Sequence, residues 1–252
     1  PLYGALSLKE QRLAIAPSPG QKIILATNIA ETSLTIPGVR TVVDSGLARV
    51  NRLNPETGLN RLELEPICKA SATQRAGRAG RTAPGSCLRL WSEREDRARP
   101  DELEPELERI DISASLLTLL HWGEPDVRAF DWLSPPQESR LEGALRLLQE
   151  LGALNEGGVT GLGRRLAGLP VHPRLGRTLI EAAKLGAGRR GSVAAALLSE
   201  RDPFPSGHRF PLWTHCDLGG RIDGVLARDS ACHPRGLEQL KRVTGQLERL
   251  IP

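Results

Sequence analysis

The chain of 252 residues is long enough for two or three small domains with real cores, and 39% of its residues are apolar. It has no apolar run long enough to span a bilayer and shows no signal-peptide pattern, so a soluble cytoplasmic protein is the default expectation. The net charge of +4 permits an anionic partner without requiring one.

The composition carries three further hints. The chain starts at Pro1 and contains no methionine, so we expect a piece of a longer polypeptide. Only five of its 34 basic residues are lysines, and this arginine bias suits contact with phosphates, although a GC-rich genome would also produce it. The four cysteines include no C-x-x-C pair, which indicates reduced thiols and predicts no metal site in this chain.

The first part of the chain alternates between short apolar strands and helical or looped connections. An amphipathic helix is predicted over residues 8–16, and the run at 22–26 predicts a strand that is buried on both faces. Further strands are predicted at 39–44 and 85–91. Open α/β sheets bind ligands where their strands end, so the polar loop at 27–35 is a candidate ligand site.

Residues 47–66 predict a β-hairpin. Two arms with partly alternating apolar residues flank Asn54-Pro55-Glu56-Thr57-Gly58, where the proline and the glycine suit a tight reversal. A plain surface hairpin is the simplest interpretation.

Residues 74–81 read Gln-Arg-Ala-Gly-Arg-Ala-Gly-Arg. Wound into a helix, this octamer places Gln74, Arg78 and Arg81 on one stripe. Two guanidiniums and an amide that project together suit a polyphosphate, because arginine donates bidentate, charge-assisted hydrogen bonds. The two glycines would cost the helix about 1 kcal/mol each relative to alanine, so local stability does not explain them. A solvated basic helix face is the alternative interpretation.

The second part of the chain is predicted to be mostly helical. The charge-dense stretch at 92–109 reads as a connection between domains. A buried helix follows at 110–122, a second one starts with Ser134 as its cap, and a small hairpin at 153–160 completes a winged-helix pattern. A free-standing winged helix often reads DNA, whereas a packed one serves as a scaffold. His172 lies between two prolines, and we expect it to cap or pack rather than to catalyse.

Three blocks of the chain resemble motifs of the superfamily 2 helicases in their DEAH/RHA form, and among these the bacterial HrpB-type helicases. Residues 1–7 are similar to motif IV, residues 26–36 to motif V, and residues 74–81 to motif VI, in the family's order. Pro37 departs from the pattern, because the family commonly has an acidic residue there.

The resemblance implies an α/β fold with three parts. A second RecA-like domain with a parallel sheet would cover residues 1–105, a winged-helix domain 106–170, and a truncated, mostly α-helical ratchet-like bundle 171–252. The chain contains no G-x-x-x-x-G-K-[ST] and no Asp-Glu-x-His box, which the family carries in a preceding RecA-like domain. The sequence therefore resembles the second half of a split active site.

The resemblance also implies roles for individual residues near ATP. Arg78 and Arg81 resemble the family's arginine fingers, and Gln74 resembles the motif VI glutamine near the γ-phosphate and the attacking water. Ser33 and Thr35 match motif V positions near the nucleotide. Mg²⁺ would be held mainly by the missing upstream domain.

Other positions match those that hold nucleic acid. Thr27 and Asn28 match residues that grip the backbone, where short polar side chains bond phosphate oxygens without reading sequence. Gly4 in the motif IV-like opening is a further candidate. In DEAH relatives the hairpin stands near the point of duplex separation. Glu31 is expected to shape the loop rather than to act as an acid or a base.

The leading hypothesis is the C-terminal part of an ATP-dependent RNA helicase that moves 3′ to 5′ along single-stranded RNA, with DNA as the other candidate substrate. Its partners would be that strand and the upstream RecA-like domain, and the fragment alone would not turn over ATP. The alternatives are a non-catalytic nucleic-acid-binding module and a protein-interaction scaffold.

Overall fold

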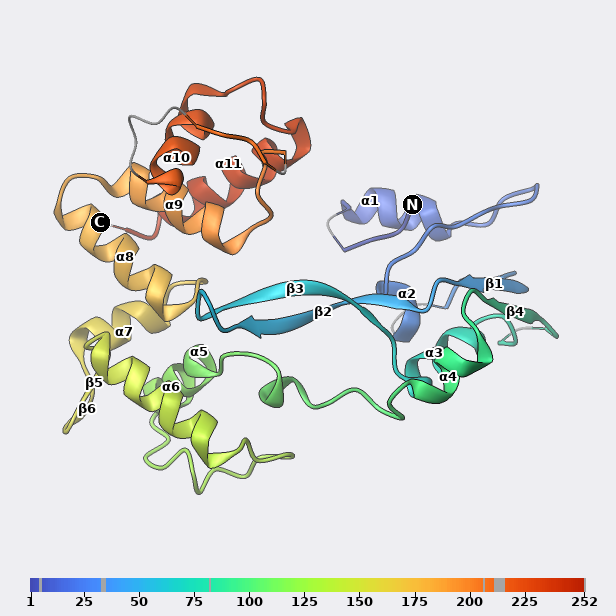
Figure 1. The fold of residues 1–252 in the computed structure, drawn as a ribbon, viewed down its shortest axis with the longest axis horizontal. Helices are drawn as coiled ribbons and strands as arrows, with labels where there is room; N and C mark the ends of the chain where they lie inside the picture. Colours follow the sequence, from blue (N-terminus) through green and yellow to red (C-terminus); the bar gives the residue numbers. More distant parts are fainter. Residues whose placement is uncertain (5, 33–34, 82, 206, 211–215, 252) are drawn as a thin grey trace. The chain divides into compact units, whose positions relative to one another are not determined.

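The structure is a computed structural model that describes residues 1–4, 6–32, 35–81, 83–205, 207–210 and 216–251. The chain forms two compact units, Pro1–Ile110 and Asp111–Pro252, each with its own helices (Figure 1). The fold is mixed α/β, with a small parallel sheet in the first unit and many helices in the second, as the sequence predicts.

The parallel sheet of the first unit consists of β1 (Thr41–Asp44) and β4 (Ser86–Arg89). Val43 lies opposite Leu88, and the two residues are 61% and 58% exposed, so this part of the sheet presents an apolar surface. The strands expected at 39–44 and 85–91 are thus present. The helices of the unit are α1 (Leu8–Ile15), α2 (Ile29–Thr32), α3 (Lys69–Ala76) and α4 (Glu93–Ala98), with a 3₁₀ turn at Glu106–Glu108.

Helix α1 confirms the helix expected over residues 8–16 and shows why it begins where it does. The Ser7 hydroxyl accepts a hydrogen bond from the Glu10 amide, and the Glu10 carboxylate accepts one from the Ser7 amide. This reciprocal capping satisfies two amides that a helix start leaves without a partner.

The prediction of a buried strand at 22–26 is wrong for this structure. Only Ala26 makes a bridge, parallel to Leu2, and the residues Ile23 and Leu25 are 84% and 73% exposed. A strand is buried on both faces only when neighbouring strands flank it and helices cover it. Among the described residues, this segment has only the single bridge.

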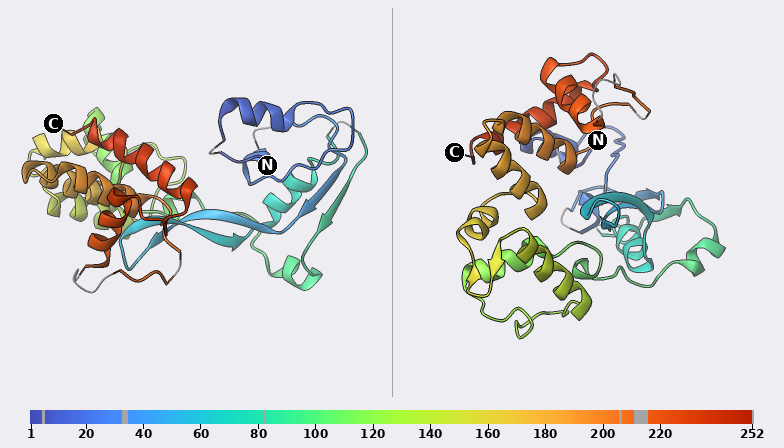
Figure 2. Two further views of the ribbon diagram at one scale, coloured as in Figure 1. Left: turned by 90° about the horizontal axis from the view of Figure 1, so that it is seen from above. Right: turned by 60° about the vertical axis from the view of Figure 1, so that its left-hand side comes forward.

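The hairpin expected over residues 47–66 is present. It consists of β2 (Leu47–Asn54) and β3 (Leu59–Pro66), which pair antiparallel from Leu47 opposite Pro66 to Asn54 opposite Leu59. The Asn54 side chain accepts a hydrogen bond from the Glu56 amide at 2.8 Å, and Gly58 adopts a φ of +63° that closes the turn. Figure 2 shows the hairpin as a long, twisted ribbon.

The second unit begins with a winged helix. Its helices are α5 (Ser113–Trp122), α6 (Glu138–Glu150) and α7 (Gly161–Ala167), and the wing is the two-stranded pair β5 (Leu154–Asn155) and β6 (Gly158–Val159). Helix α6 begins at Glu138 with Gln137 as its cap, three residues later than the cap predicted at Ser134. Pro136 disfavours helical geometry at Pro135, so the chain stays extended there and Gln137 becomes the cap.

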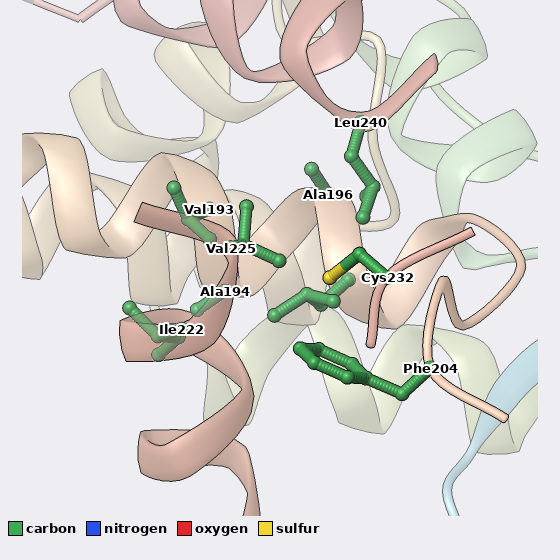
Figure 3. Packing of buried hydrophobic residues seen from close by; sticks show 9 residues of the cluster. Val193, Ala194, Ala196, Phe204, Ile222, Val225, Cys232 and Leu240 are labelled. Carbon is green, nitrogen blue, oxygen red and sulfur yellow. The ribbon is translucent and has the colours of Figure 1, made fainter. Parts of the chain in front are cut away.

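Four further helices complete the second unit: α8 (Pro173–Lys184), α9 (Gly188–Ser199), α10 (Asp217–Ala227) and α11 (Pro234–Glu248). Helix α10 lies within residues 202–235, whose many prolines, glycines and histidines gave no basis for a sequence prediction. Figure 3 shows apolar side chains from α9, α10 and α11 that meet around Phe204. In the part of the chain that is described, no helix has the length and apolar character needed to cross a bilayer.

Candidate functional site

The loop predicted to hold ligands begins beside the opening segment of the chain. The Leu2 amide donates to Leu25 O at 2.7 Å, and the Thr27 amide donates to Leu2 O at 3.1 Å. Leu2 is fully buried and anchors this contact. Gly4 is exposed in a turn two residues farther on. The motif IV-like opening is therefore joined directly to the start of the motif V-like loop.

Thr27 and Asn28 form the start of the short helix α2. The Thr27 carbonyl accepts from the Ala30 amide at 3.2 Å, and the Asn28 carbonyl accepts from the Glu31 amide at 2.9 Å. Both residues are exposed. Their backbones are thus fixed by the helix start while their polar side chains face solvent, where a ligand could reach them.

The octamer at 74–81 is not one helix, which corrects the expected stripe of three side chains. Helix α3 ends at Ala76 and Gly77 caps it, and the next amides form tighter bonds, from Arg78 to Arg75 O and from Ala79 to Ala76 O. Tertiary packing explains the early end. Ala79 is 1% exposed, and its carbonyl lies so close to Gly85 that a Cβ there would be 2.2 Å away.

The turn after α3 nevertheless brings two of the three predicted catalytic residues to the loop. The Arg81 guanidinium donates to Thr35 Oγ1 at 2.5 Å, and Arg78 Nε donates to the Glu31 carbonyl oxygen at 2.9 Å. The Arg78 Nη2 donates to the same oxygen. Gln74 is exposed on the last turn of α3. Ser33 lies outside the described residues.

The sequence analysis missed Arg75, which is the most heavily engaged side chain of the site. Its Nε donates to Glu31 Oε2 at 2.9 Å, and its Nη1 donates to Asp44 Oδ1 at 3.0 Å and to Leu47 O at 3.1 Å. Ser71 Oγ completes the group by donating to Glu31 Oε1 at 2.7 Å. These contacts fit the expectation that Glu31 shapes the loop. Arg75 falls off the predicted stripe, and its partners are far away in the sequence.

The charges in this cluster are compensated inside the protein. The side chains of Arg75, Glu31 and Asp44 are 15%, 13% and 2% exposed. Burial alone would lower the pKa of Arg75, but the hydrogen bonds that Arg75 donates to Glu31 and Asp44 outweigh it and raise the pKa above its usual value. A buried pair of this kind is costly to break, because removal of one partner leaves the other charge uncompensated.

The residues present fit a phosphate better than a cation. Arg78, Arg81 and the Thr35 hydroxyl supply donors on neighbouring segments, and donors of this kind recognise phosphate oxygens. The nearby carboxylates of Glu31 and Asp44 are already bonded to Arg75. Among the described residues, no group of three His, Cys, Asp or Glu side chains could hold a metal ion.

Two family models match the chain. The helicase conserved C-terminal domain matches residues 1–83, and the helicase associated domain (HA2), winged-helix, matches residues 144–171. The first match contains the loop at 27–35 and the turn with Arg78 and Arg81, and the second contains the wing.

Several curated proteins are similar to most of the chain. The ATP-dependent RNA helicase HrpA of Escherichia coli K12 is 42% identical over 209 residues, which are 81% of this chain and 16% of that protein. The ATP-dependent RNA helicase HrpB of the same organism is 46% identical over 202 residues, 79% of this chain and 25% of that protein. The pre-mRNA-splicing factor ATP-dependent RNA helicase prp22 of Schizosaccharomyces pombe is 41% identical over 204 residues, which are 79% of this chain and 17% of that protein.

Solved structures match over nearly the whole chain. The crystal structure of the Escherichia coli DEAH/RHA helicase HrpB superimposes with a TM-score of 0.74 at 39% identity, covering 99% of this chain and 30% of that one. The crystal structure of the Escherichia coli DExH-box NTPase HrpB gives a TM-score of 0.66 at 40% identity, covering 98% and 29%. The chain thus spans less than a third of each relative and each solved structure.

Proposed function

The chain belongs to the DEAH/RHA helicases, and from this premise we propose that it supplies the second half of a split ATPase site in a longer RNA helicase. The relatives named as ATP-dependent RNA helicases support this activity for the whole polypeptide. The chain contributes arginines and the nucleic-acid loop, while an upstream RecA-like domain contributes the phosphate loop.

The observation that carries the proposal is the contact between Arg81 and Thr35. It joins the motif VI-like turn to the motif V-like loop, although the two residues are 46 positions apart in the sequence. Arg78 reaches the same loop through the Glu31 carbonyl. Two segments that the family uses for ATP are therefore held together by side chains of the expected kind.

Arg78 and Arg81 would stabilise the negative charge that develops on the γ-phosphate during its transfer to water, and Gln74 would orient that water. Arginines in this role contribute about 10³–10⁵ in rate. Ser33 and Thr35 would contact the nucleotide. Because the carboxylates of Glu31 and Asp44 form ion pairs with Arg75, we assign Mg²⁺ to the upstream domain.

Thr27 and Asn28 would hold the backbone of single-stranded RNA, with Gly4 as a further contact. Their exposure at the start of α2 supports this role, since phosphate oxygens accept hydrogen bonds from short polar side chains and loop amides. We propose 3′-to-5′ movement along the strand. Unwinding of duplexes with a 3′ overhang, but not of those with a 5′ overhang, is the expected result.

The double variant Arg78→Ala/Arg81→Ala in the full-length polypeptide tests the proposal. RNA-stimulated ATP hydrolysis should fall by about 10³-fold or more, because the transition-state charge loses its donors. RNA affinity should stay within about threefold, a change worth less than 1 kcal/mol. Arg97→Ala is the matched control, since the Arg97 side chain is 79% exposed and pairs with Glu93 of the same helix.

Two outcomes would contradict the proposal. Loss of RNA binding with the ATPase retained would favour the non-catalytic nucleic-acid-binding module. Measurable ATP turnover by the purified 252-residue chain would show that the site is not split, because this chain would then hold every group that catalysis needs.

A further inference from the structure

We propose that Arg75 and Glu31 are positioning residues of the ATPase site, which set the orientation of Arg78 without touching the nucleotide themselves. The inference rests on the proposed function, because it deepens the role given there to Arg78. It concerns two residues outside the predicted catalytic set, and it follows from a chain of three contacts.

The first contact fixes Arg75. Three acceptors from separate segments hold its guanidinium: the Glu31 carboxylate, the Asp44 carboxylate and the Leu47 carbonyl. The Asp44 side chain is 2% exposed and also accepts from the Gly46 amide at 2.9 Å, so it is a rigid anchor at the end of β1. A planar guanidinium that is bonded along two edges has little rotational freedom.

The second contact transfers this rigidity to the loop. Glu31 lies in α2, which has only four residues and is too short to be stable on its own. Its two carboxylate oxygens are held separately, Oε1 by Ser71 and Oε2 by Arg75, and both donors come from α3. The part of the loop around Glu31, within residues 27–32, is therefore tied to α3 by the Glu31 side chain.

The third contact passes from Glu31 to Arg78. The Glu31 carbonyl oxygen accepts from both Nε and Nη2 of Arg78, so it holds one edge of the guanidinium plane. A shift of Glu31 would turn Arg78 with it. Displacement of a catalytic group by about 1 Å can cost about 10²-fold in rate. The contacts that hold Glu31 are therefore expected to affect the rate of ATP hydrolysis through the position of Arg78.

The test is a double-mutant cycle in the full-length polypeptide. Glu31→Gln keeps the shape of the side chain but removes its charge. It also replaces one carboxylate oxygen by an NH₂ group, so either Ser71 or Arg75 loses its acceptor. We expect kcat for ATP to fall by about 10–10²-fold with KM changed less than about threefold. Added to Arg78→Ala, Glu31→Gln should lower kcat no further, because residues that act through one another are not additive.

The controls separate positioning from folding. Glu93→Gln is the matched substitution, since the Glu93 side chain is 96% exposed, and it should leave kcat unchanged. In the 252-residue chain, Glu31→Gln should speed amide hydrogen exchange at residues 29–32, which reports the loop without any ATPase. If Glu31→Gln does not fold, Ser71→Ala removes one bond to the same carboxylate and should lower kcat to a smaller extent.

The outcomes distinguish this inference from the proposed function. If Arg78→Ala lowers the ATPase but the loss from Glu31→Gln simply adds to it, the positioning role is wrong and the split site survives. If Arg78→Ala alone leaves the ATPase unchanged, the proposed function is wrong. The positioning role of Glu31 is then wrong as well, because it acts through Arg78.

Discussion

Asp111 and His172, which are 61 residues apart in the sequence, meet at 3.0 Å between Oδ1 and Nε2. The other ring nitrogen of His172 accepts a hydrogen bond from the Arg174 amide at 3.2 Å, so His172 caps α8 while its far side holds Asp111. This confirms the structural role expected for His172. Asp111 also accepts from the Ser113 amide at 2.9 Å and thereby fixes the start of α5.

Acid is expected to destabilise the second unit through Asp111. Burial raises the pKa of Asp111, but the hydrogen bonds from His172 and Ser113 outweigh it and leave the pKa below its usual value. Because the folded pKa is the lower one, the stabilisation is complete above the unfolded value of about 3.9 and is lost as the pH falls through the folded value. Urea unfolding between pH 2 and pH 7 would measure this loss.

Asp111→Asn is expected to cost about 1.5–3 kcal/mol at pH 7, the range for hydrogen bonds to a charged group, and to flatten the acid dependence. The exposed Asp131→Asn should change the free energy of unfolding by less than about 0.5 kcal/mol. An Asp111→Asn curve that runs parallel to the wild-type curve across this pH range would contradict the prediction.

Gly224→Ala is expected to destabilise the second unit. A Cβ at Gly224 would lie 2.7 Å from the Phe204 ring, which is 5% exposed and packed inside the cluster of Figure 3, so the ring has nowhere to move. Overpacking costs about 1–3 kcal/mol and outweighs the gain of about 1 kcal/mol in helix propensity. Gly245→Ala in α11 meets nothing within 4 Å and should instead stabilise. Thermal unfolding of both variants should therefore shift in opposite directions.

Gly85→Ala is expected to disrupt the turn that carries Arg78 and Arg81. A Cβ at Gly85 would lie 2.2 Å from the Ala79 carbonyl oxygen and 2.6 Å from the Arg40 carbonyl oxygen, and backbone atoms cannot yield as a flexible side chain does. We expect a loss of about 3 kcal/mol or more in the first unit. Gly80→Ala has open space around it and is the control. Equal stability of the two variants in urea would show that the turn can shift at little cost.

Arg52 and Glu65 are expected to contribute a small, salt-sensitive coupling to the hairpin. Arg52 donates two hydrogen bonds to the Glu65 carboxylate, at 2.8 and 2.9 Å, and these lower the pKa of Glu65 below its usual value. Both side chains are partly exposed, so a double-mutant cycle should give about 0.5–1 kcal/mol, decreasing in 1 M salt. A coupling that does not change with salt would contradict a mainly electrostatic origin.

The features that could be predicted from the sequence depend on residues close together in the chain. Ser7 and Glu10 are three positions apart, and this spacing of a serine and a glutamate is typical of a reciprocally capped helix start. The reversal at Asn54 and Gly58 likewise depends on side chain and backbone preferences within five residues. Arg81 and Thr35, which the motifs placed near the nucleotide, are in contact, while the roles of both residues stay predictions.

The features that were missed depend on contacts across long stretches of sequence. The periodicity of the octamer predicted a continuous helix, whereas burial of Ala79 against Gly85 decides where the chain turns. The importance of Arg75 depends on Glu31 and Asp44, which are 44 and 31 positions away and leave no local pattern. The apolar run at 22–26 looked like a buried strand because composition alone does not reveal how many neighbours a strand has.

The apolar face formed where Val43 lies opposite Leu88 has a practical consequence for handling this chain by itself. Among the described residues, β1 and β4 pair only with each other, so their outer edges can accept strands from other molecules. Exposed edges beside apolar surface are templates for aggregation. Concentrated solutions of the isolated chain should therefore become turbid with time. The variant Leu90→Lys, at a residue that is 58% exposed, should remain clear.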